Sequence, residues 1–270
     1  MKQRIVIKLG GSSLQNPETL KELATLVRGY QKRRYAVVIV HGGGPAINEE
    51  LTRQNISWQF IDGQRQTTPE MMGVIDSVLG TKVNGMVVDH LKLQNISAVG
   101  MSGANGILLC SQAKPQLMQV GQVDDVNAQS IEAIVNQIGT AQVPVIAPIG
   151  VGQNGEKYNV NADWAATRIA VALNAKKLIF LTDQSGILDQ EKQLVPRATA
   201  QMIDQMILDG VISGGMFTKV KAMMTALSCG IKQVRVLHAS FASMALTADA
   251  IGTLLTNVPV HQGVMHGRAS

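Results

Sequence analysis

Short runs of apolar residues alternate along the chain with longer segments that carry an apolar residue at every third or fourth position. The run Ile5–Leu9 is broken only by Lys8, and continuous apolar runs of this length predict strands buried on both faces of a parallel sheet. Helical spacing is clearest over residues 17–33, where four aliphatic side chains share one face. The chain therefore predicts alternating strands and helices, which is typical of an α/β fold with a parallel sheet.

The same patterns predict the remaining elements. The predicted strands are 5–9, 36–40, 96–99, 143–147, 178–183, 233–238 and 252–256, with a β-hairpin over 108–123 lying over the sheet. The predicted helices are 17–33, 45–54, 69–93, 128–138, 199–209 and 217–229, with another that Asn161 caps. The first series of strands and helices gives way to a second near Leu173, which we take as the domain boundary.

Two of the predicted strands end in glycine-rich turns, Gly10–Ser13 and Gly42–Pro45, and each turn leads toward a helix. Glycine lets the backbone approach a ligand closely, and the free amides at a helix start attract anions. Lys8 adds a positive charge at the end of the first strand. Because ligands gather at the carboxyl ends of parallel strands, the two turns predict a phosphate site. Neither the P-loop pattern nor the dinucleotide fingerprint occurs in the sequence.

Composition excludes several classes of protein. Hydrophobic residues are 46% of the chain and charged residues 16%, which excludes a disordered protein. No apolar stretch reaches the roughly 18 residues that a membrane span needs, and no signal peptide precedes the first strand. We therefore expect a cytoplasmic protein without a membrane partner. Cys110 and Cys229 are predicted to be free thiols of a reducing compartment.

The net charge of +5 raises the question of nucleic acid. The one contiguous basic cluster, Lys32–Arg34, falls at the C-terminal end of a predicted helix, where the helix dipole favours cations. Aromatic residues make up only 3% of the chain, which leaves little for base stacking. We therefore expect small anionic substrates and no nucleic-acid partner.

Six motifs, taken in order, resemble the amino-acid kinase family, and within it the kinases that act on N-acetyl-L-glutamate. Each glycine turn alone is a weak signal, but six motifs in this order and at this spacing are a strong one, and they cover nearly the whole chain. The motifs are KLGGSS at 8–13, VHGGGP at 40–45, DGQR at 62–65, NVNADWAA at 159–166, LTDQSGIL at 181–188 and SGGMFTKV at 213–220.

The resemblance implies an open three-layer αβα sandwich with a largely parallel central sheet and two lobes. Residues 1–173 would bind the amino-acid substrate and form the dimer, and residues 174–270 would bind ATP. The implied reaction transfers the γ-phosphoryl group of ATP to the side-chain carboxylate of N-acetyl-L-glutamate, the second step of arginine biosynthesis. Because the sequence has no room ahead of Lys8 for an extra N-terminal helix, we expect a homodimer without arginine feedback.

The resemblance also assigns catalytic residues. Lys8 would contact the transferring phosphoryl group, Lys219 the leaving β-phosphate side, and Asp163 would orient both lysines through charge-assisted hydrogen bonds. Gly11 and Gly44 would donate backbone N–H groups to the phosphoryl oxygens. Each side chain has an ordinary alternative: Lys8 as a strand-end lysine, Lys219 as a solvated helix lysine, and Asp163 as an acid that suits a helix start.

Substrate-binding residues follow from the same resemblance. Arg65 would pair with the α-carboxylate of the substrate, since a guanidinium binds a carboxylate through two hydrogen bonds. Asn159 would hold the same end of the substrate, and Gly43 and Gly44 would offer it backbone N–H groups. The alternatives are a surface arginine and a turn asparagine. Gln66 stands where the family usually has valine, which predicts altered packing beneath Arg65.

The implied nucleotide contacts lie mostly in the second half of the chain. Mg²⁺ would be held mainly by phosphate oxygens and water, consistent with its hydration preference, so we assign no protein ligand to it. The residues implied to bind the nucleotide are Lys8, Gly10, Asp183, Gln184, Ser185, Gly186, Ile187, Leu188, Val211, Ile212, Ser213 and Lys219.

The implied chemistry needs no general base, because a carboxylate with a reference pKa near 4.3 is ionised at pH 7. Catalysis would come from positioning and from positive charge around the phosphoryl group. We expect His41 to hold its turn by hydrogen bonding. Three other functions were weighed: a related kinase acting on another carboxylate, a carbamate or a nucleotide; a catalytically silent nucleotide-binding regulator; and a dinucleotide-dependent oxidoreductase, which the missing fingerprint disfavours.

Overall fold

The structure, a computed structural model, describes residues 2–137, 142–247 and 251–257. Its centre is an eight-stranded sheet in the order β12-β14-β13-β11-β1-β2-β8-β5. Neighbouring strands are parallel except for β13 and β14, so the predicted largely parallel sheet is confirmed. The strands are β1 (Arg4–Leu9), β2 (Ala36–His41), β5 (Ala98–Ser102), β8 (Val143–Ala147), β11 (Lys177–Thr182), β12 (Arg197–Ala198), β13 (Gln233–His238) and β14 (Thr253–Leu255).

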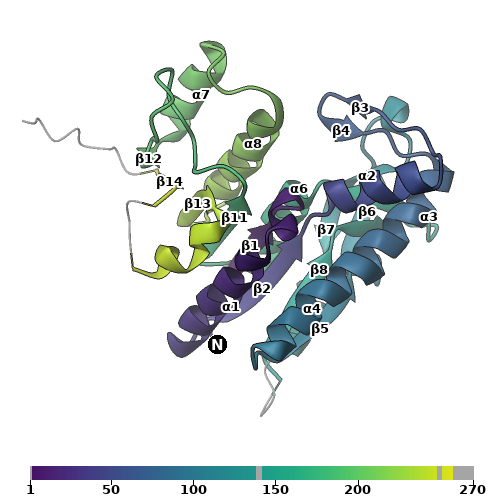
Figure 1. The fold of residues 1–270 in the computed structure, drawn as a ribbon, viewed down its shortest axis with the longest axis horizontal. Helices are drawn as coiled ribbons and strands as arrows, with labels where there is room; N and C mark the ends of the chain where they lie inside the picture. Colours follow the sequence, from purple (N-terminus) through teal and green to yellow (C-terminus); the bar gives the residue numbers. More distant parts are fainter. Residues whose placement is uncertain (1, 138–141, 248–250, 258–270) are drawn as a thin grey trace, which may run out of the picture.

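Helices cover both faces of this sheet (Figure 1). Residues of β1 alternate between two apolar clusters: Ile5 and Leu9 pack on one face, and Val6 packs on the other. Because side chains alternate along a strand, Lys8 shares the face of Val6. The first face is covered by α1 (Pro17–Lys32), α4 (Asn84–Leu93) and the 3-10 segment η4 (Ala239–Leu246), and the second by α5 (Ala128–Val135), α6 (Ala162–Ala172) and α8 (Gly214–Ser228).

A four-stranded closed barrel adjoins the sheet. It contains β6 (Leu108–Gln112), β7 (Val120–Val126), β9 (Ile149–Val151) and β10 (Lys157–Val160). The antiparallel pairing of β6 with β7 confirms the hairpin predicted over 108–123. That hairpin joins β9 and β10 in the barrel, an association that the sequence did not predict. A short hairpin of β3 (Phe60–Ile61) and β4 (Gln64–Arg65) lies apart from both sheets.

The segment 69–93, predicted to be a single helix, contains a wider π-helical turn. This turn, η2 (Val78–Val83), separates α3 (Pro69–Ser77) from α4. The apolar side chains on the two sides of the turn face different parts of the core. Those of α3 pack in a cluster with α2 (Gly44–Arg53), whereas those of α4 pack on the sheet. A π turn inside an α-helix is frequently found at functional sites. Here it brings Asn84, the first residue of α4, to the glycine turn after β2.

Smaller differences from the predictions concern element ends. The helix expected over 217–229 begins earlier, at Gly214, and α7 (Ala200–Leu208) agrees with 199–209 to within a residue. The helix predicted over 128–138 ends at Val135, and residue 138 lies outside the described residues. The Asn161 side chain accepts hydrogen bonds from the Asp163 and Trp164 amides, at 2.9 and 3.3 Å, which confirms the predicted cap of α6.

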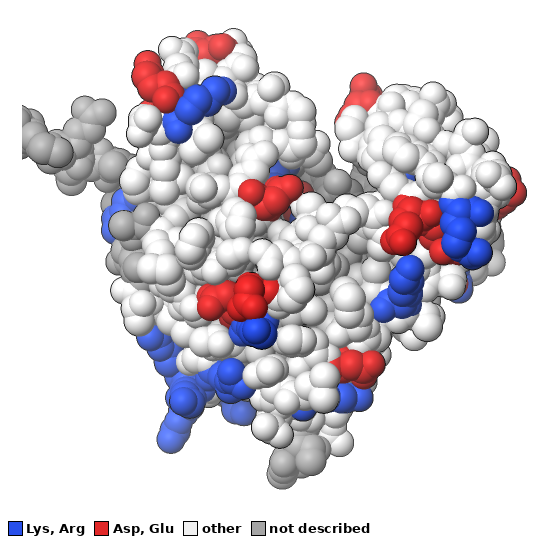
Figure 2. Space-filling view, in the orientation of Figure 1, with Lys and Arg blue, Asp and Glu red and all other residues white. Residues whose placement is uncertain are grey.

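Figure 2 shows a notch between the part that carries α7 and α8 and the part that carries α2 and the β3–β4 hairpin. The carboxyl ends of β1 and β2 are directed toward this notch, and both glycine turns follow them. The fold therefore places the predicted phosphate-binding turns where ligands gather in parallel sheets.

Candidate active site

Two lysines and one aspartate from three elements meet at the carboxyl end of β1. The Nζ atom of Lys8 lies 2.9 Å from Oδ1 of Asp163, and Nζ of Lys219 lies 3.0 Å from Oδ2. All three residues are buried, so the alternative of a solvated helix lysine fails for Lys219. Asp163 does lie in the first turn of α6, but it also pairs with both lysines. The lysines are 211 positions apart in the sequence, and the pairing of β1 with β11 and the packing of α6 on α8 bring them together.

The charges of this triad hold one another in their ionised forms. Burial would raise the pKa of Asp163, but the neighbouring charges of Lys8 and Lys219 outweigh burial and lower it to about 2. Burial and the charge of Lys8 lower the pKa of Lys219, while Asp163 opposes that change. Two cations share one carboxylate, so the group carries a net positive charge in a poorly solvated place. Such a site favours a second anion.

The two glycine turns touch each other through their backbones. A Cβ on Gly11 would lie 2.6 Å from the amide nitrogen of Gly43 and 2.8 Å from that of Gly44, so only glycine permits this approach. By contrast, a Cβ on Gly44 would meet no atom within 4 Å. Gly44 also begins α2, and the first amides of a helix lack partners within it. The structure therefore gathers backbone donors beside Lys8.

His41 and Asn84 fix the second turn from beneath. The fully buried imidazole has Nδ1 2.9 Å from the Gly42 carbonyl oxygen and Nε2 3.1 Å from Nδ2 of Asn84. Asn84 also donates to the Val145 carbonyl of β8 at 2.9 Å. Burial lowers the pKa of His41 to about 4, although the Gly42 carbonyl opposes this. His41 is neutral at pH 7 and fully engaged, as expected of a residue that holds the turn.

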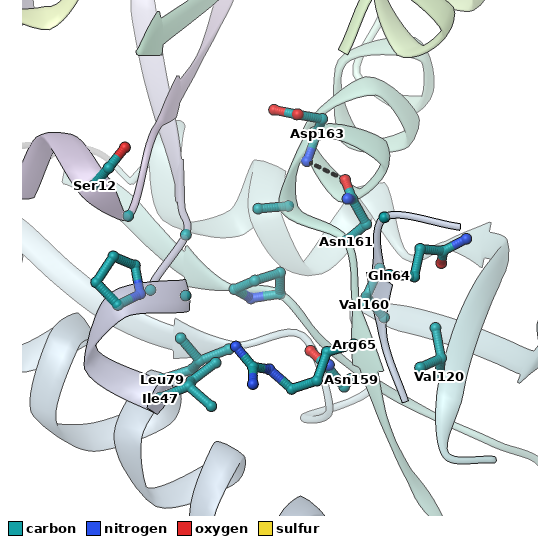
Figure 3. Close-up of a pocket in the computed structure, with 18 of the residues that line it drawn as sticks. Ser12, Ile47, Gln64, Arg65, Leu79, Val120, Asn159, Val160, Asn161 and Asp163 are labelled. Atoms are coloured by element: carbon teal, nitrogen blue, oxygen red, sulfur yellow. Dashed lines mark hydrogen bonds between the residues drawn. The ribbon is translucent and has the colours of Figure 1, made fainter. Parts of the chain in front are cut away.

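Arg65 lies at the far side of the same cavity from Asp163 (Figure 3). It is buried, and its Nη2 donates to Oδ1 of Asn48, while Nη1 has no hydrogen-bond partner among the described residues. The guanidinium carbon lies 5.1 Å from the ring centre of Trp58 and 4.8 Å from that of Phe60. Arg65 is therefore not a surface arginine. It is a buried cation held by two aromatic rings with one donor group still unused.

Asn159 belongs to a short chain of hydrogen bonds beside Arg65. Its Nδ2 donates to Oγ1 of Thr67 at 3.0 Å, and that hydroxyl donates to the Arg65 carbonyl at 3.0 Å. Gln66 hydrogen-bonds with Gln59 and with the Gln116 carbonyl and is not part of the cavity wall. The altered packing beneath Arg65 stays a prediction.

A cavity of about 290 Å³ joins these groups. Seven of the predicted site residues line it: Lys8, Gly11, Gly43, Gly44, Arg65, Asn159 and Asp163. Sequence reasoning missed Asn48, Trp58, Phe60 and Asn84, because their roles depend on contacts between elements. The Asn161 signal was visible, but it was interpreted only as a helix cap.

The predicted nucleotide residues lie beyond Asp163, along the ends of β11 and α8. Asp183 follows β11 and accepts hydrogen bonds from Thr182 and Ser12. Burial would raise the pKa of Asp183, but these hydrogen bonds and the charge of Lys219 outweigh burial and lower it. Gln184, Ser185 and Ser213 are exposed, whereas Ile187 and Ile212 are buried in the core. Gly10 donates its amide to Leu181, and Gly186 has a φ of +153°. Two of the predicted nucleotide residues, Lys8 and Lys219, are members of the triad.

No three His, Cys, Asp or Glu side chains within the described ranges are grouped so that they could hold a metal ion. No helix in the same part of the chain is long and apolar enough to cross a bilayer.

The cavity lies between two glycine turns and has Lys8 and Asp163 at one end, an arrangement in an α/β fold that is typical of a phosphotransferase. The model of the amino acid kinase family matches residues 3–238, and the chain belongs to that family. It is 40% identical to the acetylglutamate kinase of Geobacillus thermodenitrificans over 237 residues, which cover 87% of this chain and 90% of that protein. It is also 40% identical to the acetylglutamate kinase of Bacillus mycoides over 256 residues, which cover 95% and 98% of the two chains.

Solved structures agree in fold. A crystal structure of a Streptococcus mutans protein superposes with a TM-score of 0.80 at 28% identity, covering 95% of this chain and 99% of that one. A carbamate kinase from Giardia superposes with a TM-score of 0.71 at 16% identity, covering 95% and 99% of the two chains. At that identity the likeness concerns the fold alone.

Proposed function

We propose that this chain is an acetylglutamate kinase, which phosphorylates the side-chain carboxylate of N-acetyl-L-glutamate with ATP in arginine biosynthesis. The observation that carries the proposal is the pairing, in one cavity, of Lys8 and Asp163 with the unused Nη1 donor of Arg65 at the opposite side. Lys219 is joined to this arrangement through its ion pair with Asp163. The two ends suit a dicarboxylic substrate, whose α-carboxylate pairs with Arg65 while its side-chain carboxylate lies near Lys8.

The mechanism follows from these charges. The acceptor carboxylate is ionised at pH 7 and attacks without a base, and the neutral, engaged His41 does not serve as one. In-line transfer breaks the bond between the γ-phosphorus and the β–γ bridging oxygen and forms the acyl–phosphate bond. Lys8 and the amides of Gly11 and Gly44 stabilise the charge on the transferring group, and Lys219 stabilises the charge on the leaving ADP. Asp163 holds both lysines in place.

The nucleotide would lie along the segments after β11 and before α8. We assign no protein ligand to Mg²⁺, which would be bound mainly through ATP phosphate oxygens and water and would supply charge that offsets the repulsion between the acceptor carboxylate and the triphosphate. The exposed residues Gln184, Ser185 and Ser213 border this path. The substrate half and the nucleotide half correspond to the proposed division into residues 1–173 and 174–270.

We also propose a homodimer that arginine does not inhibit. Leu93 and Met86 of α4 are 80% and 40% exposed in the single chain, and apolar side chains of this kind suit a subunit contact. Light scattering of the purified protein gives the subunit count. Titration with arginine during turnover tests the absence of feedback, and inhibition there would leave the reaction assignment intact.

The reaction is tested by trapping acyl phosphate with hydroxylamine in the presence of ATP. N-acetyl-L-glutamate is compared with glutamate, aspartate and N-acetylaspartate, and the Lys8→Met variant controls for ATP hydrolysis. Turnover with N-acetyl-L-glutamate alone is the expected result. Turnover with a different acid would keep the catalytic groups but refute the substrate, and ATP binding without any turnover would favour the regulatory alternative.

A further inference from the structure

The amino ends of four neighbouring strands carry a row of cations that the sequence keeps far apart. Lys2 precedes β1, Arg33 and Arg34 precede β2, Lys176 precedes β11 and Lys232 precedes β13. We name these five residues the amino-end cluster. β13, β11, β1 and β2 are consecutive in the sheet and parallel, so their preceding residues lie side by side at one edge. At about 4.8 Å per strand the row spans about 14 Å.

The charge of the amino-end cluster is not balanced by nearby acids. No member of the cluster forms an ion pair with a carboxylate in the described part of the chain. Glu132 lies in the same region, but it pairs with Arg4. Four members are exposed and Lys176 is half-buried. In Figure 2 basic side chains gather at the lower left, toward the end of α1.

The surface at this edge is hollowed rather than flat. Two hollows of about 550 and 560 Å³ share Lys2 and Gln3 in their walls. Lys176 and Lys232 line the first hollow, and Arg33 and Arg34 line the second. Glu132, the partner of Arg4, also lines the first hollow. Two adjoining hollows with cations in their walls fit a flexible linear anion better than the flat face of a bilayer.

We propose that the amino-end cluster binds single-stranded nucleic acid through its phosphate backbone, without reading the bases. A row of about 14 Å spans about four phosphates at 3.4 Å per charge along one strand. Tyr35 is the one aromatic residue in the walls of the two hollows, and it is half-buried. Recognition therefore depends on charge rather than on stacking. The expectation of no nucleic-acid partner rested on the low aromatic content and on Lys32–Arg34 as the one contiguous basic cluster. Only the fold adds Lys2, Lys176 and Lys232.

This site lies at the opposite edge of the sheet from the Lys8–Asp163–Lys219 triad, and the inference does not depend on the proposed reaction. Electrostatic binding of this kind is strongly salt-dependent, because each neutralised phosphate releases counterions. With about four contacts on a single strand, the affinity should fall about 50-fold between 50 and 200 mM salt.

The experiment measures the anisotropy of a fluorescein-labelled 20-residue oligouridylate titrated with the full chain. The test variant combines Lys2→Glu, Arg33→Glu and Lys232→Glu, and the matched control combines Lys82→Glu, Lys192→Glu and Arg197→Glu. All six positions are exposed, and both variants have the same net charge. Circular dichroism and thermal melting verify that both are folded.

We expect wild type and control to bind at 50 mM KCl and the test variant to bind at least ten-fold more weakly. Equal losses in the two variants would show that bulk charge alone is responsible and would overturn the proposal. Failure of the wild type to bind at 50 mM KCl would overturn it too. Tighter binding of a duplex of the same length would refute the single-strand assignment.

Discussion

The central strands of the sheet carry cations at both of their ends, but the two groups of cations are in opposite surroundings. We call the side of the sheet at the carboxyl ends of these strands the carboxyl edge, and the side at their amino ends the amino edge. At the carboxyl edge, Lys8 and Lys219 are buried, and both are held within 3.0 Å of Asp163. At the amino edge, the cations of the amino-end cluster face water, and none has a carboxylate partner among the described residues.

The difference concerns what a charge can do. A buried cation acts through a weakly screened field and at a fixed position, so it can stabilise a charge that develops at one atom. Burying it is costly, and a partner such as Asp163 must offset that cost. An exposed cation is screened by salt, and several of them act together on an extended anion. The carboxyl edge therefore suits chemistry, and the amino edge suits reversible association.

The largest effect is expected from replacing Lys8. Lys8→Arg keeps the charge but places a larger planar group beside the Gly11–Gly43 contact, so the donor no longer meets the phosphoryl oxygens. We expect kcat to fall about 100- to 1000-fold, with little change in either KM. Lys176→Arg, at the amino edge, is the matched control and should leave kcat unchanged. Steady-state kinetics decide, and a Lys8→Arg enzyme with nearly normal kcat would remove Lys8 from the reaction.

Loss of the shared carboxylate should be nearly as harmful and should also affect stability. Asp163→Asn leaves two buried ammonium groups without an anionic partner, which costs about 3–5 kcal/mol of unfolding free energy. Asp204 forms an exposed pair with Lys221 at 3.8 Å, and Asp204→Asn should change stability by less than about 1 kcal/mol. Urea unfolding of both variants tests the contrast. If Asp163→Asn were as stable as the wild type, the two lysines would not depend on Asp163 as their buried anionic partner.

The pH dependence of stability should depend on His41. Its pKa is lowered by burial to about 4 in the folded protein and is about 6.5 when unfolded. Between pH 6.5 and 4 the unfolded chain binds a proton at His41 that the folded protein does not bind. The contribution of His41 to the free energy of unfolding is therefore fully present above pH 6.5, and about 3 kcal/mol of it is lost as the pH falls to 4. Asp163, with a folded pKa of about 2, adds a loss only below about pH 4.

Urea midpoints measured at pH 7, 5.5 and 4.5 should reveal this slope. His41→Asn should be less stable at pH 7, because the Gly42 and Asn84 bonds are weakened, and it should lose most of the slope between pH 6.5 and 4. An unchanged slope in the variant would assign the acid sensitivity to other groups.

Sequence reasoning succeeded where the signal was local. The glycine turns, the Asn161 cap and the strand that ends at Lys8 were each visible in a few neighbouring residues. The meeting of Lys8 with Lys219 was expected only from the family resemblance, because no local pattern specifies a contact across 211 positions. Sheet topology supplies it.

The remaining features depend on packing between elements. The π turn of η2 could not be predicted, because its residues also suit an α-helix. The turn is needed only because α3 packs against α2 whereas α4 packs against the sheet. The aromatic rings around Arg65 come from a segment without periodicity. The amino-end cluster is dispersed over four strand starts, so the sequence displays together only Arg33 and Arg34.

The smallest expected effect concerns the rings that hold Arg65. Removing the bidentate donor itself, by Arg65→Lys, should raise the KM for the amino acid about ten-fold or more. Phe60 is 52% exposed, and its ring contacts the Arg65 guanidinium. Phe60→Leu leaves the guanidinium in place but weakens this cation–π contact. A loss of about 0.5–1 kcal/mol corresponds to a two- to five-fold rise in that KM, with kcat and the KM for ATP unchanged.

Phe241 is the matched control for this change, because it is also 52% exposed and packs against His238 rather than Arg65. Phe241→Leu should leave every kinetic constant unchanged. An equal rise in KM for both variants would mean that the loss of an exposed ring perturbs the fold in general. A fall in kcat with Phe60→Leu would place the ring's influence at the triad, across the cavity from Arg65, and would show that the two ends of the site are coupled.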